Sequence, residues 1–323
     1  VIEASASTVV GLNAVIVAVT DEAPRVLVIP HDRERDSLPF GPLDPGRDRT
    51  LELALRGWVR EQTGMELGYV EQLYTFGDRW RHPGERDGDH RLVTVGYLAL
   101  VREERLTSDA RWRPFYDYLP WEDRRDGRPA VVGDMLEPWL ETFITQGPGF
   151  GAKTRGDVRD RRERVDIAFG MGGASWDSDR VLDRYELLYE ARLVAEPFAD
   201  RERPVPADRP MAGRAMAYDH RRILATALSR LRGKIRYRPV VFELLPDTFS
   251  LLQLQRVVEA LSGMRLHKQN FRRLVEKSGL VEGTGQFATG TGGRPPELFR
   301  FRRDVLRERP SPGVGLPGLP GRQ

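Results

Sequence analysis

The acidic residues of one predicted helix are the first candidates for catalytic chemistry. Carboxylates three and four residues apart share a helix face and can hold Mg²⁺ against a pyrophosphate, where the metal activates water. A Pro/Gly-rich loop at 38–47 precedes a helix that we predict over residues 50–63, ended by Gly64. Glu61 stands alone on its face, because Glu52 and Glu66 lie off it. One carboxylate does not hold Mg²⁺ firmly, so we predict no catalytic residue and no metal site.

The loop, helix and glycine together resemble a Nudix box, the motif that carries the catalytic carboxylates of Nudix hydrolases. Aligned on Gly64, its Arg-Glu pair falls on Gly57-Trp58 and its Glu-Glu pair on Glu61-Gln62. The resemblance implies that the Nudix fold is kept while the carboxylates are lost at Trp58 and Gln62. Two alternatives stay open: Glu61 is an ordinary surface carboxylate, or it works with partners from elsewhere in an active hydrolase that cleaves ADP-ribose or another nucleoside diphosphate.

Composition and charge limit the class of protein. A chain of 323 residues suggests two domains, and the lack of cysteine excludes disulfides and thiolate-bound zinc. No apolar run is long enough to span a membrane and no signal peptide is visible, so we expect a cytoplasmic protein. Residues 231–303 hold 14 Lys and Arg against six Asp and Glu, a local charge of +8 in a chain of net charge +3. This basic segment suggests a nucleic-acid module, or else a solvated basic face.

Residue patterning predicts a mixed fold in the first part of the chain. Two β-branched runs at 8–19 and 25–29 predict a hairpin, and further strands are expected at 68–76 and 91–101. The helix at 50–63 has its apolar stripe at Leu51, Ala54, Leu55, Trp58 and Gln62. Strands combined with one helix after a Gly/Pro loop indicate an α+β fold.

The middle of the chain predicts helices around a mobile stretch. Helices are expected at 130–146 and 177–195, and the Gly- and charge-rich stretch 147–175 between them is predicted to be mobile. A linker at 204–210 precedes a further helix at 218–232, which we expect to join two domains.

Two short helices near the C-terminus predict a helix-turn-helix. Ser250 can cap the first, Ser262-Gly263 breaks it, and the second covers 267–278 with Phe271 buried. Residues 281–301 then supply two strands around a Gly-rich turn, which is typical of a wing. The expected DNA contacts are polar side chains of the second helix and of the wing: Lys268, Gln269, Asn270, Arg272, Arg273 and Arg294. The alternative is a small basic domain that binds protein or RNA.

Several stretches resemble the Nudix-related transcriptional regulators of NAD metabolism, the NrtR family. They are 38–41, 69–78, 95–100, 217–221, 242–246 and 270–273 with 293–295. The resemblance implies a Nudix-like α/β/α sandwich followed by a winged helix. It also implies a repressor that binds ADP-ribose or an NAD-related nucleotide, needs no cofactor, and meets a palindromic duplex DNA operator as a homodimer.

This organisation predicts five parts of the chain and one ligand site. The parts are a Nudix-like domain at 1–126, a helical insertion of unknown role at 127–211, a linker helix at 212–236, a winged helix at 237–304 and a disordered tail at 305–323. A ligand with a pyrophosphate and an adenine ring needs cations and aromatic rings. The candidates near the loop and at a strand end are Arg33, Arg35, Tyr74, Phe76, Asp78 and Arg79.

Overall fold

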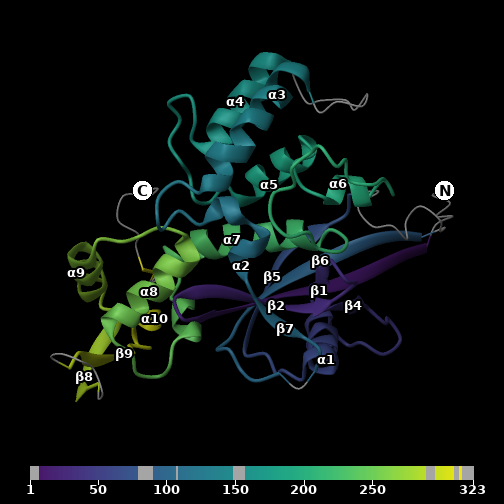
Figure 1. Cartoon of the computed structure of the whole chain (residues 1–323). Helices are drawn as coiled ribbons and strands as arrows, with labels where there is room; N and C mark the ends of the chain where they lie inside the picture. Colours follow the sequence, from purple (N-terminus) through teal and green to yellow (C-terminus); the bar gives the residue numbers. More distant parts are fainter. Residues whose placement is uncertain are drawn as a thin grey trace.

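The computed structural model describes residues 7–78, 90–106, 108–147, 157–288, 295–308 and 313–314. Its first part is a seven-stranded mixed sheet in which β3, β2, β1, β6 and β5 are neighbours in that order, β4 also pairs with β1, and β7 also pairs with β2 (Figure 1). The strands are β1 (Ser7–Thr20), β2 (Ala23–Pro30), β3 (Asp36–Ser37), β4 (Phe40–Pro42), β5 (Tyr69–Phe76), β6 (His90–Leu100) and β7 (Arg111–Pro114). None of the described helices is long and apolar enough to cross a membrane.

The predicted hairpin is present and turns within two residues. Asp21 and Glu22 both have positive φ angles, 50° and 62°, which is the backbone of the turn that matches the twist of paired strands. Thr20 pairs directly with Ala23, so Pro24, which lies between the two predicted runs, belongs to β2 and not to the turn. The long strand β1 then runs parallel to β6 over eleven residue pairs, Ser7 to Val17.

The two faces of the sheet are buried under different helices, which makes the expected α/β/α sandwich (Figure 1). Alternate residues of β1 point to opposite faces. Leu12, Ala14 and Ile16 pack with α1 (Leu51–Thr63), whereas Val15 and Val17 belong to the core under α7 (His220–Ile235). Each of the Leu, Ile and Val side chains contributes roughly 1.5–3 kcal/mol when fully buried, so the alternation fixes which residues of β1 face each helix.

Helix α1 begins and ends where the sequence predicts. The Thr50 side chain accepts the Leu53 N–H, and Gly64 ends the helix with φ of 75°. Its buried residues are Ala54, Leu55, Val59 and Thr63. The buried face of α1 therefore differs from the predicted one. Trp58 and Gln62 were expected in the core, but they are only partly buried and contact β4 instead.

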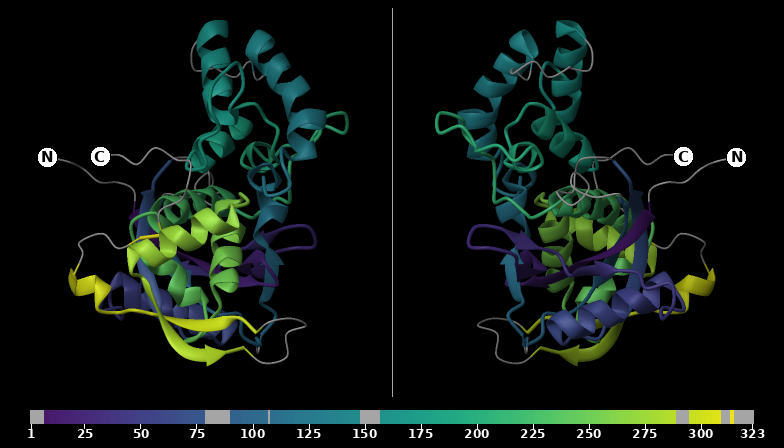
Figure 2. Two further views of the ribbon diagram at one scale, coloured as in Figure 1. Left: turned by 90° about the vertical axis from the view of Figure 1, so that its left-hand side faces the viewer. Right: turned by 90° about the vertical axis from the view of Figure 1, so that its right-hand side faces the viewer.

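The insertion contains more regular structure than expected. Helix α2 (Phe115–Tyr118) and the 3-10 turn η2 (Pro120–Glu122) precede it. Its own elements are the π-helical turn η3 (Val131–Leu136), α3 (Glu137–Gln146), α4 (Val158–Phe169), α5 (Val181–Glu190) and α6 (Glu196–Ala199). The prediction of a mobile stretch at 147–175 was wrong for α4. Asp157 and Asp160 form a capping box that starts this helix, and Val165 and Phe169 anchor it in the core. Figure 2 shows α3 and α4 side by side, away from the sheet.

Helix α7 continues into a winged helix domain. Its elements are the 3-10 turn η4 (Val240–Leu244), α8 (Leu251–Ser262), α9 (Lys268–Ser278), β8 (Val281–Phe287), β9 (Glu297–Phe301) and α10 (Val305–Glu308). Ser250 and Gln253 form a capping box on α8, and Gly263 ends that helix with φ of 68°. Strands β8 and β9 pair antiparallel as the predicted wing.

Part of the predicted disordered tail at 305–323 is ordered. Val305 is fully buried in α10, and Val314 is 1% exposed, with its N–H donating to the carbonyl of Ile235 at the end of α7. A composition rich in Pro and Gly predicts disorder, but Val305 and Val314 both pack into the main hydrophobic core, and this burial orders the chain around them. The rest of the tail beyond Glu308 lies outside the described residues, apart from Gly313.

Candidate functional site

The two positions of α1 where the resemblance to a Nudix box predicts lost carboxylates, Trp58 and Gln62, hold the neighbouring strand β4. The indole Nε1 of Trp58 donates to the carbonyl of Pro42 at 2.9 Å. Gln62 accepts the Phe40 N–H at 3.1 Å and donates to the Phe40 carbonyl at 2.7 Å. Glu61 is exposed. Among the described residues no three His, Asp or Glu side chains converge as a metal site, and the Mg²⁺ that the Nudix fold implies does not fit where an indole and an amide are engaged with β4.

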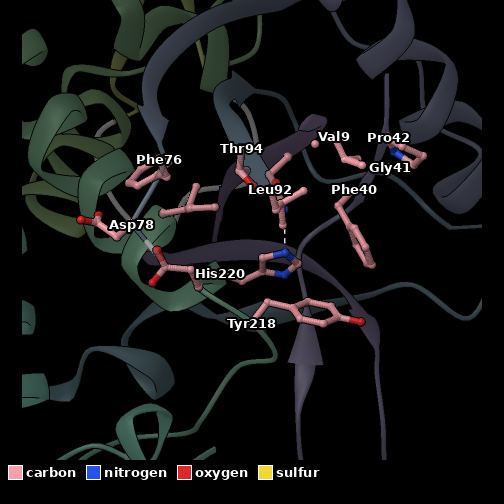
Figure 3. A pocket seen from close by; sticks show the side chains of 14 residues that line it. Val9, Phe40, Gly41, Pro42, Phe76, Asp78, Leu92, Thr94, Tyr218 and His220 are labelled. Carbon is pink, nitrogen blue, oxygen red and sulfur yellow. Dashed lines mark hydrogen bonds between the residues drawn. The ribbon is translucent and has the colours of Figure 1, made fainter. Parts of the chain in front are cut away.

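A pocket of about 140 Å³ opens beside this strand. Its walls come from β1, β4, β6, the end of β5 and the start of α7, as Figure 3 shows. Aromatic and aliphatic side chains supply most of the lining, with Phe40, Phe76 and Tyr218 as its rings. Asn13, Thr94 and His220 add neutral polar groups, and the carboxylates are those of Asp78 and Asp219.

His220 is the best-fixed polar group of the pocket. It is 3% exposed, and its Nδ1 accepts the N–H of Leu38 at 3.0 Å. A neutral ring then carries its proton on Nε2, which lies 2.6 Å from the side-chain amide of Asn13. The structure places the amide nitrogen of Asn13 nearest to Nε2. A flip of the amide, which exchanges its oxygen and nitrogen, turns the oxygen toward this N–H as its acceptor. The rings of Phe40 and Tyr218 lie edge-on to His220, at 5.2 and 5.3 Å.

The backbone conformation of Tyr218 places its ring between those of Phe40 and His31. Tyr218 has a φ of 54°, in the left-handed region, directly before α7 begins. A side chain other than glycine rarely adopts this conformation, which costs about 1–3 kcal/mol and needs support from its surroundings. Here the Tyr218 ring contacts both Phe40 and His31, at 5.4 and 5.0 Å. The strained residue therefore stands at the junction between the pocket and α7.

Charge at the pocket is negative and partly neutralised. Asp78 and Asp219 both pair with the guanidinium of Arg222, which also pairs with Glu186 on α5. The same guanidinium lies 5.4 Å from the centre of the Phe76 ring. No Lys or Arg belongs to the described lining, so this pocket suits a neutral ring or a sugar diol better than a phosphate.

The structure places only some of the predicted ligand residues in the pocket. Phe76 and Asp78 line the pocket. Tyr74 is 61% exposed and does not line the pocket, although its ring lies edge-on to that of Phe76 at 5.4 Å. Arg33 and Arg35 lie before β3, away from the lining. Arg35 pairs with Asp32 at 2.7 Å. Arg79 lies outside the described residues.

Sequence reasoning missed Asn13, Phe40, Tyr218 and His220 as pocket residues. Asn13 and His220 are 207 residues apart, so no local pattern joins them. A signal was present at the start of the amphipathic helix α7, where Tyr218 lies just before the helix and His220 is its first residue.

The second site is the exposed face of α9. Phe271 and Val275 are fully buried and hold the helix on its domain. The side chains predicted to contact DNA are all exposed on the remaining surface: Lys268, Gln269, Asn270, Arg272 and Arg273. Within the described part of the chain none of these cations is paired with a carboxylate. Lys268 and Arg272 also line a groove of about 560 Å³ between α8, α9 and the wing. Arg294 lies outside the described residues.

A buried ion cluster joins the turn η2 to α5 and α7. The Glu122 carboxylate accepts from Arg184 of α5 at 2.5 and 2.9 Å and from Arg232 of α7 at 2.5 Å, and all three side chains are at most 1% exposed. Burial alone would raise the pKa of Glu122, but the two guanidiniums outweigh it and hold that pKa below its usual range.

The same cluster fixes the end of α8. Arg232 donates to the carbonyl of Leu261 at 3.1 Å, and the Tyr116 hydroxyl donates to that of Ala260 at 2.7 Å. A Cβ on Gly263 would lie 2.4 Å from the Glu122 carbonyl, so the chain passes closely there. The winged helix is thus attached to α7 and to the sheet domain by buried polar contacts.

Comparison with known proteins identifies both parts of this architecture. Residues 241–301 match the family model described as the NrtR DNA-binding winged helix domain. A curated relative, the ADPR responsive transcriptional repressor NtrR of Acinetobacter baylyi, is 41% identical over 86 residues. That match covers 27% of this chain and 34% of the relative, so the chain spans about a third of the length of the curated relative.

Solved structures match over nearly the whole chain. NrtR of Shewanella oneidensis, in complex with a 27mer DNA, has a TM-score of 0.53 at 21% identity, covering 92% of this chain and 95% of that chain. A MutT/nudix family protein from Enterococcus faecalis has a TM-score of 0.51 at 17% identity, covering 92% and 87%. The resemblance to the NrtR family that the sequence indicated is therefore confirmed, and the chain has the NrtR fold: a Nudix-like domain followed by an NrtR-type winged helix.

Proposed function

We propose that this protein is a DNA-binding transcriptional repressor that responds to ADP-ribose or an NAD-related nucleotide through a non-catalytic Nudix-like pocket. The observation that carries the proposal is α7 itself. Its first residues line the pocket, and its last turns hold α8 of a winged helix whose α9 presents unpaired cations within the described structure. Ligand binding and DNA binding therefore share one buried helix. The Acinetobacter relative is named as an ADPR responsive repressor, which supports the same assignment.

On the DNA side, α9 is the reading helix. Gln269, Asn270, Arg272 and Arg273 would face base edges in the major groove, while Lys268 beside the wing groove would contact phosphate. Two copies of the chain in a homodimer would place two such helices on the half-sites of a palindromic operator. Duplex DNA and NAD-related metabolites are both present in the cytoplasm of bacteria, where we propose that the protein acts.

On the ligand side, the pocket receives one ring of the metabolite. Its volume of about 140 Å³ is small beside the roughly 300–1,000 Å³ typical of sites for whole drug-sized ligands. Phe40 and Tyr218 offer ring surfaces, and Asp78 and Asp219 are suited to accept hydrogen bonds from a ribose diol. The pyrophosphate would lie outside this cavity, which has no cation in its described lining.

Hydrolysis is the competing function, and the geometry of α1 argues against it. Trp58 and Gln62, at two Nudix box positions, are hydrogen-bonded to β4, and Glu61 alone retains a carboxylate. Incubation of the protein with Mg²⁺ and a panel of nucleoside diphosphate derivatives should give no turnover. Robust turnover that Glu61→Gln abolishes would show that the protein is an enzyme.

DNA binding is tested on the promoter upstream of the protein's own operon. The wild type should bind the duplex with an affinity that falls steeply with salt. Arg272→Ala combined with Arg273→Ala should weaken binding about 30-fold or more, since two good base contacts at roughly 1–3 kcal/mol each are worth at least about 2 kcal/mol together. ADP-ribose binding should be unchanged in this double variant.

The matched control removes two exposed arginines far from the winged helix. Arg47→Ala combined with Arg49→Ala, in the loop before α1, should leave DNA affinity close to that of the wild type. Equal loss in both double variants would mean that overall charge, not α9, governs binding. Absence of any salt-sensitive duplex binding by the wild type would favour a scaffold that binds protein or RNA.

A further inference from the structure

Strand β4 has backbone partners on one edge and side-chain partners on the other. Its residues Phe40, Gly41 and Pro42 pair with Asn13, Leu12 and Gly11 of β1. On the opposite edge Gln62 contacts both the N–H and the carbonyl of Phe40, and Trp58 donates to the carbonyl of Pro42. Helix α1 thus satisfies three backbone groups that a neighbouring strand would otherwise satisfy.

The fit between α1 and β4 requires a glycine at position 41. A Cβ built on Gly41 would lie 2.2 Å from the indole of Trp58, a distance that no real contact allows. The ring therefore lies directly on the backbone of β4. Together with the amide of Gln62, the indole fixes the distance of β4 from α1 and the position of this three-residue strand along its own axis.

Phe40 transmits this fit to the pocket. Its ring lines the cavity and lies edge-on to both His220 and Tyr218, the residues at the start of α7. A shift of β4 would displace this ring and change the width of the pocket. Preorganised side chains avoid the entropy loss of being ordered on binding, so a fixed Phe40 favours ligand affinity.

We propose that Trp58 and Gln62 are positioning residues for the ligand pocket: the former catalytic helix now holds β4 so that Phe40 stands ready to contact the ligand. This inference rests on the proposed function, because it assigns a purpose to α1 in ligand binding. It also goes beyond the predicted lack of catalysis, because it gives Trp58 and Gln62 a role in ligand binding.

Gln62→Glu is the sharpest test, because the side chain keeps its shape while losing its donor. The new carboxylate can still accept the Phe40 N–H but faces the Phe40 carbonyl with a second acceptor. We expect the Kd for ADP-ribose, measured by calorimetry, to rise about tenfold or more, the effect of losing one hydrogen bond and leaving a carbonyl unpaired. Trp58→Phe, which loses only the indole donor, should give a smaller rise.

The matched control is Glu61→Gln, the reverse isosteric change at the adjacent, exposed position of α1. It should leave ADP-ribose affinity unchanged. All three variants should melt as cooperative folded proteins and bind operator DNA like the wild type when no ligand is present. A merely structural role for Gln62 would instead lower thermal stability and leave the Kd of the folded fraction unchanged, and that result would overturn the inference.

Hydrogen exchange gives a second readout that does not depend on the ligand. The Phe40 amide should exchange faster in Gln62→Ala than in the wild type, whereas amides in the middle of α1 should keep their protection. Unchanged exchange at Phe40 would overturn the inference. Failure of the wild type to bind ADP-ribose would overturn the proposed effector instead, and the exchange experiment would still decide whether α1 holds β4.

Discussion

The substitution Glu122→Gln should destabilise the whole protein, because it removes the one carboxylate that neutralises two buried guanidiniums. Glu122 and Arg184 are fully buried and Arg232 is 1% exposed, so water cannot replace the lost charge. Breaking a buried ion pair on one side costs about 3–5 kcal/mol. Glutamine retains one acceptor oxygen, which places the expected cost near the lower limit, about 3 kcal/mol.

Thermal unfolding followed by circular dichroism measures this effect. Since 1 kcal/mol shifts the midpoint by roughly 2–4 °C in domains of 150–250 residues, we expect a fall of roughly 6–12 °C. The control is Glu141→Gln, which breaks the exposed pair with Arg162 and should leave the midpoint almost unchanged. A fall of less than about 2 °C for Glu122→Gln would refute the reasoning that this cluster stabilises the fold.

The pH dependence of the same variant gives an independent check. The pKa of Glu122 is lower in the folded protein than the roughly 4.3 of an unperturbed glutamate. Its stabilising contribution is therefore complete above that unfolded value and is lost as the pH falls through the lower folded value. The difference in stability between wild type and Glu122→Gln should be constant near neutral pH and shrink below about pH 4.

Three further predictions concern the two binding sites. Phe271→Ala should cost about 3–5 kcal/mol in the winged helix, because the ring is fully buried, and should abolish operator binding in a mobility-shift assay; retained binding would mean that α9 is held otherwise. His220→Ala removes the acceptor of the Leu38 N–H and the edge contacts of Phe40 and Tyr218, so calorimetry should show at least a tenfold weaker affinity for ADP-ribose; equal affinity would place the ligand elsewhere. Chelation of divalent metal with EDTA should leave ADP-ribose affinity unchanged, and a metal-dependent Kd would contradict a pocket that binds without Mg²⁺.

Local signals in the sequence were sufficient for most of the elements. Thr50 and Gly64 mark the ends of α1, and Ser250 and Gly263 mark the ends of α8, because caps act within a few residues. The same kind of signal was overlooked at Asp157 and Asp160, where high charge concealed a capping box and led to the prediction of a mobile stretch.

The pocket could be predicted only in part, because it is assembled from distant segments. Phe76 and Asp78 were found since a strand end is a local feature. Asn13, Phe40 and His220 come together only when β1, β4 and α7 pack. Arginines 33 and 35 were chosen for their charge, and the fold places them outside a cavity whose described lining holds no cation.

The contact between Trp58 and Gly41 also bears on how the chain could evolve. Restoring a carboxylate at position 58 or 62 alone would remove hydrogen bonds that β4 now receives, before enough ligands exist to retain a metal. Either single change would thus weaken the hold of α1 on β4 without creating a metal site. A catalytic metal site on α1 would need several changes together, so the contact between α1 and β4 opposes the gain of metal-dependent chemistry one residue at a time.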